Sequence, residues 1–256
     1  MKRTFILLMA ALLFLPACTQ EIRTETLAVE EEIPFREGSD NNLSLNLNID
    51  FPTAGFAQEA LAEIRKAVRV NTLGEEYADF TGSVAELGQA WRNKVAEEYV
   101  ASNEEMLREN EMSEEDAPFL NWGYDYNGSF GESYKNYVNY FIVQYQYLGG
   151  AHGMNVECPL VFDRKTGRIV GWETFAPSLT REQLCALLDQ HKYDGLKDVI
   201  DENDLDEENI FYVETIEPSR WFTVGEEGLT FYYQPYDLAP YVFGVITIPV
   251  PWEELK

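Results

Sequence analysis

The chain has 256 residues, of which 45 are Asp or Glu and 19 are Lys or Arg, and its formal net charge is -26 at pH 7. A chain this negative repels nucleic acid and anionic lipid headgroups, so we expect no nucleic-acid partner, and it attracts basic partners through salt-sensitive fields. Aromatic residues make up 14% of the chain, which is too many for a disordered acidic protein. The composition therefore predicts a folded protein of one large domain or two small ones.

The beginning of the chain has the pattern of a secretory signal peptide, predicted to span residues 1–17. Lys2 and Arg3 precede an apolar run from Phe5 to Leu15, which is too short to cross a bilayer because a spanning helix needs about 20 apolar residues. The run leads into Leu-Pro-Ala-Cys, which looks like a lipobox, the motif whose cysteine thiol receives a diacylglyceryl group. We therefore predict lipid attachment to Cys18; the alternative is an ordinary signal peptide with a chance cysteine.

Lipid on Cys18 would anchor the protein to a membrane of the bacterial cell envelope, at the periplasmic face of the outer membrane or at the cell surface. Residues 18–42 carry many charges, few large apolar groups and no clear period, which predicts a flexible tether between the lipid and the folded protein. After the tether we expect an N-terminal α+β region at residues 43–130 and a C-terminal domain at residues 131–256.

The first predicted elements are one strand and two helices. Apolar and polar residues alternate from Leu43 to Ile49, which is the period of a half-buried strand, and Pro52 ends it. Apolar residues at helical spacing then predict a first helix that ends before Asn71 and Gly74. Ser83 and Glu86 form a capping-box pattern that begins a longer helix. The apolar stripe of this helix predicts core packing and consists of Val84, Leu87, Trp91, Val95 and Tyr99.

Strands dominate the rest of the chain. The aromatic run from Tyr137 to Tyr147 has large side chains on both alternating faces, which predicts a strand with both faces at least partly covered. A capping box of Thr180 and Gln183 begins another helix, and further strands extend to Ile248. This order of elements predicts an α+β fold, with an antiparallel β-sheet and helices packed mainly on one face.

Segments in the second half of the chain resemble a known family. They read Tyr-Leu-Gly-Gly-Ala-His-Gly at residues 147–153, Phe-Asp-Arg-Lys-Thr-Gly-Arg at 162–168, and Phe-Tyr-Tyr-Gln-Pro-Tyr-Asp-Leu-Ala-Pro-Tyr at 231–241, followed by Gly244. Together they are similar to the extracellular domain of the RsiV-like family, typified by the anti-sigma-V factor and often preceded by a smaller companion domain. The resemblance covers residues 131–256, and residues 43–125 match the companion only in the order of strands and helices.

The resemblance implies an α+β domain on the outer side of a membrane and, for the best-understood relative, direct binding of lysozyme. Lysozyme is strongly basic, so it complements a chain with a net charge of -26. The anti-sigma relative also has an intracellular sigma-binding segment and a spanning helix, neither of which we find in this sequence. The signalling role is therefore not carried over.

The candidate ligand-binding residues are Tyr147, His152, Tyr236 and Tyr241. His152 has glycines close to it in sequence, which let a ligand approach the backbone, and imidazole titrates near neutral pH. The tyrosines combine contact area with a polar tip, which suits contact with a sugar or a protein. The alternative for each residue is structural, with the histidine turning the chain after a strand and the tyrosines packing in the core.

No residue pattern identifies a catalytic or a metal site. The second histidine, His191, falls on a predicted helix stripe, and no His-Glu-x-x-His or paired-cysteine spacing completes a zinc site. We therefore expect no metal and no cofactor. Cys158 and Cys185 either form a disulfide, which an envelope compartment permits, or pack separately as small buried side chains.

The leading hypothesis is a non-enzymatic envelope lipoprotein that binds a protein or a cell-wall glycan, with a basic muramidase of the lysozyme type as the most concrete ligand. The alternative is a hydrolase that acts on envelope glycans through two carboxylates. The sequence has 45 acidic residues, and nothing in their spacing singles out a catalytic pair.

Overall fold

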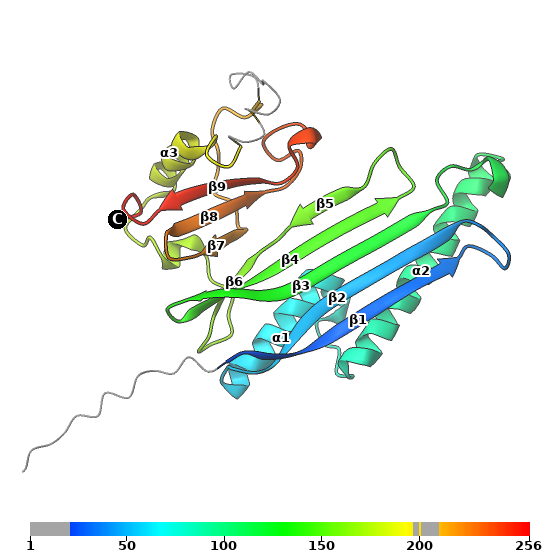
Figure 1. Cartoon of the computed structure of the whole chain (residues 1–256), viewed down its shortest axis with the longest axis horizontal. Coiled ribbons are helices and arrows are strands. Elements are labelled where there is room, and N and C mark those ends of the chain that lie inside the picture. The colour runs from blue at the N-terminus through cyan, green and yellow to red at the C-terminus, as the bar shows by residue number, and fades with distance from the viewer. Residues whose placement is uncertain (1–20, 197–199, 201–209) are drawn as a thin grey trace, which may run out of the picture.

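The computed structural model describes residues 21–196, 200 and 210–256, so the predicted signal peptide and Cys18 lie outside the described residues. Within these ranges, nine strands form one sheet of six strands and one of three, and three α-helices accompany them. The predicted α+β fold is confirmed. Figure 1 shows the smaller sheet beside the end of the larger one where β6 lies.

The larger sheet has the strand order β1-β2-β3-β4-β5, and β6 pairs with the first part of β4. Its strands are β1 (Arg23–Pro34), β2 (Asn42–Ala54), β3 (Trp122–Tyr134), β4 (Tyr137–Leu148), β5 (Met154–Glu157) and β6 (Leu160–Asp163). Neighbouring strands are antiparallel except β2 and β3, which are parallel. This parallel pair is possible because two helices separate its strands in the sequence and form the crossover.

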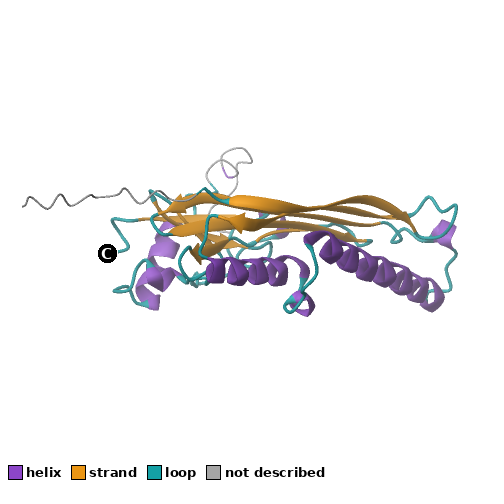
Figure 2. Ribbon diagram, turned by 90° about the horizontal axis from the view of Figure 1, so that it is seen from below, coloured by secondary structure: helices purple, strands orange, loops and turns teal. Residues whose placement is uncertain are grey.

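Two helices, α1 (Gln58–Leu73) and α2 (Val84–Glu109), cover one face of the larger sheet. Figure 2 shows both helices on the same side of the strands. The predicted capping box at the start of α2 is confirmed, and all residues of its predicted stripe are buried. α1 continues past Asn71 and ends at Leu73, directly before Gly74, whose φ of 119° favours glycine.

The strand β1 occupies much of the segment predicted as a flexible tether, so that prediction is wrong for residues 23–34. β1 pairs along its whole length with β2. As an edge strand with helices on one face only, it needs few apolar residues: Leu27 is buried and Val29 is partly buried. A glutamate on the same face pairs with α2, since Arg92 donates to Glu31 at 2.8 and 2.6 Å. This polar composition concealed the strand.

The smaller sheet contains β7 (Phe222–Val224), β8 (Gly228–Tyr233) and β9 (Ile246–Pro251), which are antiparallel in that order. α3 (Arg181–His191) begins at the predicted capping box and contacts β9. The 3-10 helices are η1 (Glu75–Tyr77), η2 (Glu114–Asp116), η3 (Trp172–Thr174) and η5 (Tyr241–Phe243). Within the described ranges, no helix has the length and apolarity that crossing a membrane requires.

Buried hydrophobic residues form two clusters, and the chain passes from the first to the second near residue 161. The first cluster lies between the larger sheet and its two helices, and the second includes the smaller sheet and α3. The predicted boundary between residues 130 and 131 falls instead inside β3, where Phe130 pairs with Tyr140 of β4. The change in composition near this point marks the return from helices to strands within one sheet.

β4 passes from one cluster to the other, and the cover on its two faces differs along its length. Val138, Tyr140 and Ile142 are buried in the first cluster. On the opposite face, Asn139 is buried where β7 covers it, and its side chain donates to the Val224 carbonyl at 2.8 Å and accepts from the Val224 N–H at 3.0 Å. Both faces are therefore covered only in the first part of the strand, and further along Tyr145 is exposed.

Candidate functional site

Three of the four candidate ligand-binding residues, His152, Tyr236 and Tyr241, lie together and are called the aromatic cluster below. The rings of His152 and Tyr241 stack with centroids 4.1 Å apart and an interplanar angle of 26°. The Tyr236 hydroxyl is 3.5 Å from Nε2 of His152, and its ring centroid is 5.7 Å from that of Tyr241. Tyr241 also donates to the Gly153 carbonyl at 2.6 Å. The cluster thus joins the β4–β5 loop to the β8–β9 loop.

The backbone of both loops is adapted to this arrangement. Gly149 has a φ of 76°, and a Cβ there would collide with the backbone of Phe119. A Cβ at Gly153 would collide with the ring of Tyr145. Tyr236 has a φ of 74°, a conformation that is uncommon for an aromatic residue and costs about 1 kcal/mol or more. Strain of this kind is retained most often at functional sites.

Large hydrophobic side chains near the aromatic cluster are unusually exposed. Tyr236 is 51% exposed, and Val242, which follows Tyr241 in η5, is 81% exposed. Tyr212, 58% exposed, donates to the Ala239 carbonyl of the same loop. Exposed apolar side chains gathered in one place mark interaction surfaces more often than single ones do.

Tyr147, the fourth candidate, lies on the face of β4 opposite the helices, across from Gly123 of β3. Its neighbour on that face, Tyr145, lies against Gly153 and so reaches the loop of the aromatic cluster. Sequence reasoning missed Tyr145 as a site residue. The two-residue period placed both tyrosines on one face, but it carries no information on which of them meets the loop.

Gln234, close to the aromatic cluster in sequence, links the two sheets. Its side chain accepts from the Glu157 N–H at 2.8 Å and donates to the Glu157 carbonyl at 2.7 Å, so it takes the place of a neighbouring strand at the end of β5. Burial raises the pKa of the Glu157 carboxyl. A glycosidase needs two carboxylates about 5 to 9.5 Å apart. A single acid of raised pKa does not supply that pair.

Cys158 and Cys185 are free thiols, so the structure has the second of the two predicted arrangements, without a disulfide. Cys158 packs against the first hydrophobic cluster, and Cys185 of α3 lies with its Sγ 3.7 Å from Oε2 of Glu217. Burial raises the pKa of Cys158 to about 11, and burial together with the Glu217 carboxylate raises that of Cys185. Thiols of raised pKa are weak nucleophiles at neutral pH.

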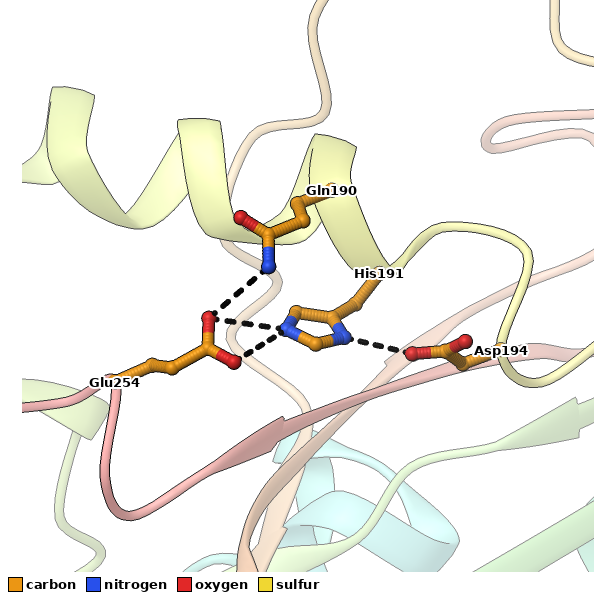
Figure 3. A network of polar contacts seen from close by, with 4 residues as sticks. All are labelled: Gln190, His191, Asp194 and Glu254. Carbon is orange, nitrogen blue, oxygen red and sulfur yellow. Dashed lines mark hydrogen bonds and ion pairs between the residues drawn. The ribbon is translucent and has the colours of Figure 1, made fainter.

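His191, the second histidine, lies in a network of polar contacts at the end of α3 (Figure 3). Its Nδ1 is 2.6 Å from the Asp194 carboxylate and its Nε2 is 3.2 Å from that of Glu254, which also accepts from Gln190 at 3.3 Å. Burial lowers the pKa of His191, but hydrogen bonds to the two carboxylates outweigh it and the net shift is upward. Among the residues described, no set of three His, Cys, Asp or Glu side chains could hold a metal ion.

Comparison with known proteins finds a family model that matches part of this chain. Residues 175–253, which include α3, the smaller sheet, Tyr236 and Tyr241 but not His152, match the family described as "Protein of unknown function (DUF3298)". No curated protein matches the chain.

Two crystal structures have similar folds over nearly the whole chain. A member of the DUF3298 family from Bacteroides fragilis NCTC 9343 has a TM-score of 0.77 and 21% sequence identity over 92% of each chain. A DUF3298 family protein from Pseudomonas aeruginosa PAO1 has a TM-score of 0.56 and 18% identity, over 93% of this chain and 94% of that one. At such identities the likeness shows the fold alone. Residues 175–253 thus match the DUF3298 family, and the fold of the chain is similar to those of two DUF3298 proteins.

Proposed function

We propose that this chain is an envelope lipoprotein, anchored through Cys18, whose aromatic cluster binds a basic protein, and that a muramidase of the lysozyme type is the ligand. The resemblance to the RsiV-like family, with its companion domain, and the net charge of -26 support this class of ligand. The signal-peptide and lipobox patterns support the anchor. The observation that carries the proposal is the exposed Tyr236, held at positive φ beside the stacked His152 and Tyr241 rings.

An exposed aromatic side chain that is already positioned is the kind of residue that dominates the free energy of binding at protein interfaces. Tyr236 loses little freedom when a ligand covers it, because its neighbours and its backbone hold it before binding. Attraction between the acidic chain and a basic ligand raises the association rate and is screened by salt. Loss of the Tyr236 ring should therefore act mainly on dissociation, and salt mainly on association.

Calorimetric titration of the purified protein with lysozyme at low and high salt tests this proposal. We expect micromolar or tighter binding that survives about 0.15 M salt, and a loss of about tenfold or more in Tyr236→Ala. Ile169→Ala is the matched control, because Ile169 is 47% exposed but lies outside the aromatic cluster. An absence of heat at both salt concentrations, or an equal loss in both variants, contradicts the proposal.

The lipid anchor is tested separately with Cys18→Ser. Labelled palmitate supplied to cells should enter the unchanged protein but not the variant. The variant should also leave the membrane fraction, because each buried acyl methylene contributes about 0.8 kcal/mol to membrane binding. Label in the variant, or none in the unchanged protein, contradicts the lipobox interpretation.

The alternative, a hydrolase acting on envelope glycans, has one supporting feature, the partly buried Glu157 carboxyl with its raised pKa. A raised pKa suits a general acid. Release of reducing ends from peptidoglycan by the protein, abolished in Glu157→Gln, would favour this alternative over a binding module.

A further inference from the structure

The face of the larger sheet opposite α1 and α2, called the open face here, carries a distinct set of side chains. Strand pairing places them in three rows across the sheet: Glu30, Asn46, Asp125, Tyr145 and Asn155; Ala28, Asn48, Asn127, Val143 and Glu157; and Glu32, Ser44, Gly123 and Tyr147. Figure 1 shows these five strands side by side, with the helices behind them. The rows contain four carboxylates and no Lys, Arg or His.

The centre of the open face is a fixed strip of amides around one carboxylate. Asp125 accepts from Nδ2 of Asn46 at 3.1 Å and from Nδ2 of Asn127 at 2.7 Å. These bonds set the orientation of the three side chains and leave further donors and acceptors on the amides facing solvent. Because both asparagines are exposed, a ligand can reach those groups without displacing protein.

An aromatic column borders this strip on β4. Tyr145 is directly across from Asp125 and is 41% exposed, and Tyr147 follows on the same face. Beside Tyr147, Gly123 has open space where a side chain would project. Oriented amides and carboxylates bind hydroxyl and amino groups, while an aromatic ring packs against the C–H surface of a sugar. The open face brings these two kinds of group together over several strands.

We propose that the open face binds a glycan of glucosamine units that carry free amino groups. Charge selects this ligand, because the rows contain four carboxylates and no basic residue and therefore attract ammonium groups and repel acidic sugars. A basic protein fits the open face less well, since the core of a protein interface is normally more apolar than its rim and depleted in charged residues. Here the centre is Asp125 with its amides, which are costly to desolvate, whereas a glycan keeps them hydrogen-bonded and partly hydrated.

Calorimetric titration of the purified protein with a glucosamine oligomer at about pH 6, where its amines are charged, tests the proposal. The N-acetylated oligomer should bind about tenfold more weakly, because it lacks the ammonium groups. Asp125→Asn should weaken binding of the free amine by a similar factor. Glu97→Gln on α2 is the matched control, because it removes the same charge from an exposed residue on the helix side of the sheet.

Asn127→Ala is a second variant of the amide strip, and unlike a change at Tyr145 it leaves the packing on Gly153 intact. Circular dichroism and thermal unfolding establish that each variant is folded. The proposal is overturned by equal binding of the two oligomers, by an equal loss in Glu97→Gln, or by no binding of either oligomer. It is also overturned if Asp125→Asn weakens binding of lysozyme and not of the glycan. Tyr236→Ala, which tests the aromatic cluster, should not change glycan binding.

Discussion

The two faces of β2 differ completely although their residues alternate along one strand. Leu45 and Leu47 are at most 2% exposed beneath the helices, whereas Asn46 and Asn48, which alternate with them, are exposed on the other side of the sheet. The covered face carries the apolar burial that stabilises the fold. The other face does not contribute this burial, so its residues can be selected for binding a ligand. β4 shows a third arrangement, in which the smaller sheet covers the face opposite the helices at Asn139, whereas that face is exposed elsewhere.

The largest expected effect is on the covered face. Leu47→Ala should lower the free energy of unfolding by about 2 to 5 kcal/mol, because it removes buried methyl groups and leaves a cavity that the sheet and helices fill only in part. Denaturant unfolding followed by circular dichroism measures this change. A loss below about 1 kcal/mol would mean that this face is less tightly packed than the burial of Leu47 implies.

A smaller loss is expected where the second sheet covers β4. Asn139→Ala should cost about 1 to 3 kcal/mol, because the backbone N–H of Val224 then lacks its buried partner. Hydrogen exchange should also accelerate at that N–H more than at the centre of β2. Asn48→Ala provides the comparison, since it removes the same side chain where no second sheet lies over it.

The third effect depends on pH and tests the contact between His191 of α3 and Glu254 near the C-terminus. The pKa of His191 is raised in the folded protein by its carboxylate partners, so its contribution to stability is complete below its unfolded pKa of about 6.5 and is lost as pH rises through the folded value. His191→Gln should therefore reduce the melting temperature at pH 5.5 more than at pH 9. Equal reductions at both values would show that packing, and not charge, makes the contribution.

The smallest effect is expected on the open face. Asn48→Thr should change the free energy of unfolding by less than about 0.5 kcal/mol, because an exposed strand position tolerates substitution and threonine has the higher strand propensity. Thermal unfolding of this variant beside Leu47→Ala compares the two faces at adjacent residues. A large loss would mean that the open face contributes to stability and is not free for binding.

Elements with a complete local pattern were predictable from the sequence. The alternation at Leu43–Ile49 gave β2, and the capping boxes at Ser83 and Thr180 marked the beginnings of α2 and α3. β1 was not predictable in this way, because an edge strand covered on one face, with Glu31 paired to a helix, has a polar composition. The aromatic cluster joins residues 84 positions apart, so local patterns could suggest its members but not their contact.

The contacts of Gln234 with Glu157 have a consequence for behaviour at high concentration. An unpaired sheet edge is a template on which strands of other molecules can add, which leads to aggregation. At β5 the amide of Gln234 already occupies both backbone groups of Glu157, and at the opposite edge Glu30 and Glu32 of β1 would repel an identical strand. The larger sheet is therefore protected at both ends against growth from one molecule to the next.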